Sequence, residues 1–148
     1  MIPLVIDTNI LVAALLRRGG VARRVVRGCL AGDYEPLIGA ALFSEYEDVF
    51  ARDTPWKSSL LTAREREQLL DGFLHKCRWV EVFYAWRPNL PDEADNHLVE
   101  LALAGNAAAI VTRNIGDLTR GELKFPGLQI LKPEDCLETH PSQLFMPS

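Results

Sequence analysis

The run Leu4-Val5-Ile6 near the start of the chain constrains the fold more than any other feature. It is apolar without alternation, which is typical of a parallel strand that is buried on both faces. Asp7 follows it directly, and a second buried run, from Ala107 to Thr112, has the same character. Because ligands of open α/β sheets bind beyond the carboxyl ends of the strands, Asp7 is expected at a functional edge of the sheet.

Strand-like and helical patterns alternate along the rest of the chain. Further strands are predicted at Glu35–Gly39, Trp79–Tyr84 and Leu128–Leu131. Helical spacing is predicted for Ile10–Leu15, Val21–Leu30, Ala40–Arg52, Thr62–Cys77, Asp92–Gly105 and a short segment after Lys132. This order indicates an α/β fold, a three-layer sandwich with a central parallel sheet of about five strands flanked by helices. Right-handed crossovers can then place the first and fourth strands side by side.

Length and composition indicate one domain spanning residues 1–148, in which residues 140–148 form a loose tail. No apolar run approaches the roughly 18 residues that cross a bilayer, and the start of the chain lacks a secretory pattern. Three cysteines lie far apart at Cys29, Cys77 and Cys136, which argues against a disulfide framework. A cytoplasmic protein without a membrane partner is expected.

A net charge of -4 argues against bulk affinity for nucleic acid, but the charge is unevenly distributed. Five arginines lie within eleven positions, namely Arg17, Arg18, Arg23, Arg24 and Arg27. They form either a solvated helix face or a surface for phosphate or a partner, and the pattern does not choose between these.

Several acids fall where chemistry is plausible, and each also has a structural explanation. On a helical wheel both Glu45 and Glu47 lie at the edge of the buried stripe of 40–52, so periodicity does not choose between them. Asp7 alone could form a turn, with Asn9 capping the next helix. Asp92 and Asp95 lie where helix caps favour acids, although they also begin the core-facing stripe.

The neighbouring polar residues leave the same choice open. Thr8 and Thr112 are either orienting hydroxyls or plain polar residues beside strand ends. His97 is expected at the surface, because the three histidines have no ligand spacing. If the helix that begins at Asp92 follows simple antiparallel layering, its start is expected at the edge of the sheet opposite Asp7, unless a loop reaches across.

Four elements in order carry a family resemblance: a strand followed by Asp7-Thr8-Asn9, a helix with Glu45, the motif Asp92-x-x-Asp95-Asn96, and Ile110 to Asp117. Together they resemble a PIN domain, and more narrowly the PIN-type toxins of toxin-antitoxin pairs, from Ile2 to about Leu131. The resemblance implies a metal site of Asp7, Glu45 and Asp95, completed by Asn114 or Asp117, with Asp92 nearby. The usual acid at position 114 is an amide here. Supporting residues would be Thr8, Asn9, Asn96 and Thr112.

Such a cluster of oxygen ligands suits Mg²⁺ or Mn²⁺, which would relieve the repulsion between its carboxylates. The resemblance implies a metal-dependent endoribonuclease that hydrolyses RNA phosphodiester bonds, with Asp7, Glu45, Asp95 and Asp117 catalytic, restrained by a small antitoxin protein. Homodimers are common in that family. RNA or partner contacts are expected at the arginines, that is Arg17, Arg18, Arg23, Arg24, Arg27 and Arg113.

The sequence is also compatible with two other functions. A non-catalytic PIN-like module that binds RNA or protein would explain the amide Asn114. A phosphoryl-transfer enzyme with Asp7 as nucleophile ranks third, because the residue two positions later is Asn9 and no Lys lies near Thr112.

Overall fold

A computed structural model of the chain describes residues 1–17, 20–52, 56, 59, 61–82, 96–114 and 127–141. Its strands are β1 (Ile2–Ile6), β2 (Tyr34–Ile38), β3 (Arg78–Trp79), β4 (Ala109–Val111) and β5 (Gln129–Leu131). Its helices are α1 (Thr8–Leu16), α2 (Val21–Ala31), α3 (Ala40–Ala51), α4 (Ala63–Lys76), α5 (Asn96–Ala104) and α7 (Pro133–Thr139). The predicted alternation of strands and helices is therefore confirmed.

The five strands form one parallel sheet in the order β3-β2-β1-β4-β5. The first strand is central, and β4 pairs with it so that Ile6 lies opposite Val111. The expected neighbourhood of the two buried runs is confirmed, and Asp7 and Thr112 follow them at the same edge. Leu4, Val5 and Ile6 are fully buried, as their unbroken apolar run requires.

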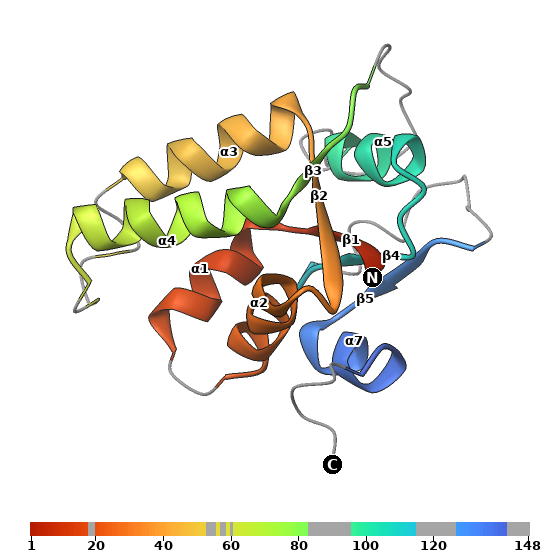
Figure 1. Cartoon of the computed structure of the whole chain (residues 1–148), viewed down its shortest axis with the longest axis horizontal. Helices are drawn as coiled ribbons and strands as arrows, with labels where there is room; N and C mark the ends of the chain where they lie inside the picture. Colours follow the sequence, from red (N-terminus) through yellow and green to blue (C-terminus); the bar gives the residue numbers. More distant parts are fainter. Residues whose placement is uncertain are drawn as a thin grey trace.

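Helices cover both faces of the sheet, which gives the three predicted layers (Figure 1). Helix α5 packs on β1, β2 and β4, whereas α2 and α7 lie on the other face, against β2 and β5 respectively. Helices α3 and α4 lie side by side and extend beyond the sheet. No helix within the described ranges is both long and apolar enough to cross a membrane.

Local signals agree with most of the element boundaries. Thr62 and Glu65 form the predicted capping box, in which Thr62 accepts from the Glu65 amide and Glu65 accepts from the Thr62 amide. Helix α2 ends at Gly32, whose φ of 90° is a left-handed conformation that glycine adopts readily. The third strand differs from its prediction of 79–84. It covers Arg78–Trp79, since only this stretch pairs with the end of β2, while residues 83–84 lie outside the described part.

The predicted tail begins with residues that are held in place. The Tyr34 hydroxyl donates to the carbonyl of His140, and the His140 ring contacts Gln129. Residues 142–148 lie outside the described part of the chain.

Candidate active site

The Asp7 side chain lies at the carboxyl edge of the sheet and does not cap the helix that follows. Asp7 is the N-cap residue of α1, yet its carboxylate makes no cap hydrogen bond. Instead Oδ2 accepts from the Thr112 hydroxyl at 2.7 Å and from Nδ2 of Asn9 at 3.2 Å. Asn9 is therefore not the cap of α1, and the Asp7 carboxylate bonds across to the residue that follows β4.

Glu45 is brought to the same edge by α3. Its Oε1 accepts from the Thr8 hydroxyl at 2.5 Å, and the Tyr46 hydroxyl donates to the carbonyl of Ile6. These two bonds tie consecutive residues of α3 to both sides of Asp7. They also settle the choice that periodicity left open, because Glu47 is exposed and lies elsewhere on α3.

The pKa values of the two carboxylates are shifted in opposite directions by their surroundings. Burial raises the pKa of the Asp7 carboxyl above its ordinary value, the hydrogen bond from Thr112 lowers it, and the charge of Glu45 raises it. The pKa of Glu45 is lowered, chiefly by a hydrogen bond from His97 and also by the bond from Thr8, while burial opposes them. A buried acid beside a second acid is the electrostatic pattern of a cation site or of an acid-base pair.

The Thr8 and Thr112 hydroxyls both orient carboxylates, which decides between the two roles that the sequence left open. Thr112 also accepts a hydrogen bond from the amide of Asn114 at 3.0 Å, so the segment after β4 turns toward Asp7. The Asn114 side chain is exposed and lines the same cleft. The two threonines therefore support the site from the segments that follow β1 and β4.

An open cleft of about 500 Å³ lies over this edge of the sheet. Its polar lining consists of Asp7, Thr8, Asn9, Glu45, Asn114 and the two arginines Arg17 and Arg113. An apolar wall comes from α1 and α3, with Val12, Ala13, Leu16 and Val49. The cleft therefore combines two acids, two arginines and a set of aliphatic side chains.

The His97 side chain was not expected in the site, and its position also corrects the layering prediction. It lies at the second residue of α5, is 19% exposed, and donates from Nε2 to Oε2 of Glu45 at 2.9 Å. A helix that leads into a parallel strand starts at the carboxyl edge of the sheet, so α5 begins near Asp7 and not at the opposite edge. The sequence signal was the adjacency of His97 to Asp95-Asn96.

The other predicted site residues divide into two groups. Asn96 begins α5, although its side chain is not described. Four predicted residues lie outside the described part of the chain, namely Arg18, Asp92, Asp95 and Asp117. Their roles stay predictions.

Comparisons with known proteins agree with this architecture. A family model described as PIN domain matches residues 3–116, which is more than half of the chain. The chain belongs to the PIN domain family. A chain in the crystal structure of VapBC2 from Rickettsia felis bound to a DNA fragment from their promoter has a similar fold, with a TM-score of 0.60 and 18% sequence identity. The match covers 87% of this chain and 97% of that one. The search of curated proteins gave no match.

The donor set of this PIN domain fits a hard divalent cation as far as it is described. Carboxylate, hydroxyl and amide oxygens converge at the cleft, and the buried Oδ1 of Asn9 has no hydrogen-bond partner among the described residues. Across the same residues no group of three or more histidines, cysteines and acids could hold a metal ion. In the predicted set, Asp95 and either Asn114 or Asp117 would complete the site, with Asp92 nearby.

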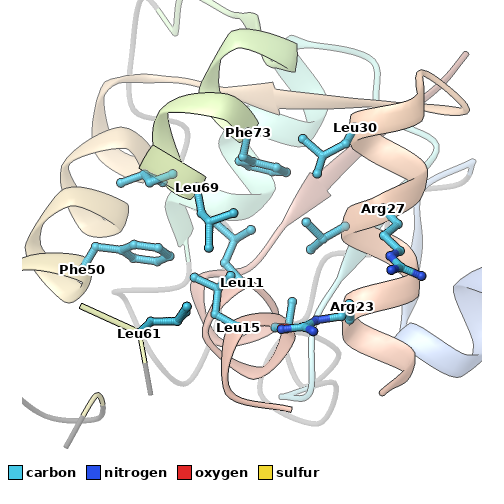
Figure 2. Close-up of a pocket in the computed structure, with 12 residues that line it drawn as sticks. Leu11, Leu15, Arg23, Arg27, Leu30, Phe50, Leu61, Leu69 and Phe73 are labelled. Atoms are coloured by element: carbon cyan, nitrogen blue, oxygen red, sulfur yellow. The ribbon is translucent and has the colours of Figure 1, made fainter. Parts of the chain in front are cut away.

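A second hollow of the PIN domain has different chemistry. A groove of about 370 Å³ lies between α1, α2, α3 and α4, and its lining is mostly apolar (Figure 2). It is lined by Leu11, Leu15, Leu30, Phe50, Leu61, Leu69 and Phe73, among others, with Arg23 and Arg27 on α2. The arginine cluster is thus divided. Arg17 lines the acidic cleft, and Arg23 and Arg27 line the groove. Arg24 also lies on α2, between Arg23 and Arg27 in the sequence.

Proposed function

We propose that this PIN domain is a metal-dependent endoribonuclease that hydrolyses RNA phosphodiester bonds and is the toxin of a toxin-antitoxin pair. The observation that supports this most directly is the pairing of Asp7 and Glu45 at one edge of the sheet, where threonines orient both carboxylates. The PIN family model and the fold shared with a VapBC2 chain support the same class.

In this proposal Asp7 and Glu45 hold Mg²⁺ or Mn²⁺ together with Asp95, and Asn114 or Asp117 completes the set. When bound, the cation supplies charge neutralisation at the scissile phosphate and activation of the attacking water. Thr112 and Thr8 keep the two carboxylates pointed into the cleft, so little reorganisation is needed on binding. Asn9, whose Oδ1 has no hydrogen-bond partner in the described part of the chain, is available as a further oxygen ligand, while its Nδ2 donates to Asp7.

The cleft also has the features that an RNA strand needs. Arg17 and Arg113 can each pair with a phosphate beside the reaction centre. The apolar side chains of Val12, Leu16 and Val49 offer a surface for a base that has left its stack. A net charge of -4 is compatible with this, because the positive charge is placed locally.

The antitoxin is assigned to the apolar groove. An amphipathic segment with apolar residues on one face and acids at its margin would complement the leucines and phenylalanines of the lining and the guanidinium of Arg27 (Figure 2). The similar fold occurs in a VapBC2 assembly, which supports a protein partner. Self-association into a homodimer stays a prediction from the family.

The replacement Asp7→Asn tests the catalytic proposal. Purified wild-type protein should cleave single-stranded RNA in the presence of Mn²⁺ and lose this activity with EDTA, whereas Asp7→Asn should be inactive at every Mn²⁺ concentration. Glu47→Gln is the matched control on α3, because its carboxylate is exposed and lies outside the cleft. Cleavage by Asp7→Asn at the wild-type rate would contradict the assignment.

The amide at position 114 favours the alternative of a non-catalytic binding module. Calorimetry separates the two functions, since only a nuclease site should bind Mn²⁺ in a manner that is abolished by Asp95→Asn. RNA binding without Mn²⁺ binding would support the module.

A further inference from the structure

His97 contacts a predicted metal ligand from outside the cleft. Its Nε2 donates to Oε2 of Glu45 at 2.9 Å, while Thr8 donates to Oε1. The residues that line the cleft do not include His97. It lines a separate hollow, together with Gly39, Val80 and Leu101. An RNA strand in the cleft would therefore meet Glu45 without meeting His97.

The Glu45 carboxylate needs such support. Its side chain is 37% exposed and has three rotatable bonds, so without partners it would sample several rotamers. The two donors come from different elements, α1 and α5, and each holds one oxygen. A carboxylate oxygen that accepts one hydrogen bond keeps a lone pair for a cation. Together the two bonds fix the direction of both free lone pairs.

The imidazole of His97 is itself fixed in position. Helix α5 packs through Leu98, Val99, Leu101 and Ala102, all of which are buried, against β1, β2 and β4. His97 precedes this buried stripe by one residue and is mostly covered. The sheet therefore determines where Nε2 lies, and Nε2 in turn determines where Glu45 points.

We propose that His97 is a positioning residue, which holds the Glu45 carboxylate in the orientation that a divalent cation requires. The proposal rests on the metal-dependent function proposed above. Hydrogen-bond partners of metal-ligating groups change metal affinity or activity by about 10- to 100-fold when they are replaced. The loss should appear in cation affinity and in kcat, while KM for RNA stays unchanged because His97 lies outside the cleft.

Two replacements of similar length and helix propensity isolate the hydrogen bond. His97→Met removes the donor, whereas His97→Gln keeps an N–H group near the position of Nε2. We expect His97→Met to weaken Mn²⁺ binding by about 10-fold or more in calorimetry. His97→Gln should restore most of the affinity. His75→Met is the control, because His75 is an exposed histidine on α4 whose ring contacts the carbonyl of Asp71 in the same helix.

The outcomes separate this proposal from the nuclease proposal. If His97→Met binds Mn²⁺ like the wild type while Asp7→Asn does not bind it, the positioning role is wrong and the nuclease proposal stands. If the wild type binds Mn²⁺ without cleaving RNA, and His97→Met still weakens binding, the positioning role stands and the nuclease proposal fails. An equal loss of affinity in the Met and Gln variants, with a lower melting temperature in both, would overturn the positioning role in favour of packing.

Discussion

Helices α1 and α3 line both the acidic cleft and the apolar groove, but the two hollows depend on different interactions. The residues of α1 that line the cleft are Thr8, Asn9, Val12, Ala13 and Leu16. Those that line the groove are Leu11, Ala14 and Leu15. On α3, Glu45 and Val49 line the cleft, whereas Phe50 lines the groove. A helix that is apolar on nearly every side is normally buried all round. In α1, Ile10 is fully buried in the core, while other apolar residues of the helix line the two hollows.

The two hollows obey different physical rules. The cleft depends on a few directed hydrogen bonds to the Asp7 and Glu45 carboxylates, so single polar atoms decide its chemistry. The groove depends on apolar area, which tolerates changes of shape better than changes of polarity. A replacement in one hollow should therefore leave the function of the other intact, and the predictions below test this separation.

Leu69→Glu should affect the groove and spare the cleft. Leu69 lies on α4, lines the groove and is 44% exposed, so the fold should accept a charge there. A bound partner would bury that charge, and we expect its Kd to rise by about 30-fold or more, which corresponds to about 2 kcal/mol. The partner to test is the product of a short reading frame that overlaps or precedes this gene, and Kd is measured by calorimetry. RNA cleavage without the partner should not change.

Leu103→Glu is the matched control for that experiment. Leu103 is similarly exposed, at 40%, but lies on α5 and does not line the groove. It should bind the partner like the wild type. Equal losses in both variants would mean that the groove is not the binding surface.

Asp7→Asn should stabilise the metal-free protein at neutral pH. Burial raises the pKa of Asp7 in the folded protein, so the folded form keeps its proton to a higher pH than the unfolded chain. The unfolded chain then binds fewer protons, and wild-type stability falls as pH rises from about 3.8 through the folded-state pKa. Asn cannot ionise and avoids this loss. Its Oδ1 can still accept from Thr112.

Urea unfolding between pH 3 and 8, in EDTA, measures the difference. The advantage of Asp7→Asn should be absent at the acidic end, grow through that window and then stay constant. Excess Mn²⁺ should reverse the order of stability, because the ion binds only the folded wild type. A variant that is less stable than the wild type in EDTA at pH 7 would show that Asp7 is not electrostatically costly.

The sheet and the position of Asp7 could be predicted because they follow from local patterns. An unbroken apolar run indicates a central strand, and the residue after it must lie at the carboxyl edge. The capping box at Thr62 was predictable for the same reason, since both of its bonds lie within one turn. Each of these features is encoded within a few consecutive residues.

The contacts that complete the site could not be predicted from periodicity. His97 and Glu45 are 52 positions apart, and a lone histidine carries no sign of its partner. Choosing Glu45 over Glu47 required the rotation of α3, which the hydrogen bond from Tyr46 to Ile6 fixes across 40 positions. The arginines were divided between two hollows because α2 lines one of them and the end of α1 lines the other. These features depend on how helices pack, which single-element patterns do not encode.

Thr62→Ala should have the smallest effect and should again distinguish the two hollows. The replacement removes the side-chain half of the capping box at the start of α4, which we expect to cost about 1 kcal/mol in the free energy of unfolding. Helix α4 borders the groove through Leu69, Leu70 and Phe73, whereas no residue of α4 lines the cleft. Partner affinity should therefore fall slightly while Mn²⁺ affinity stays at the wild-type value.

Thr62→Ser keeps the hydroxyl and is the control in urea unfolding and calorimetry. A drop in Mn²⁺ affinity with Thr62→Ala would show that α4 supports the acid pair, and that cleft and groove are coupled through α3.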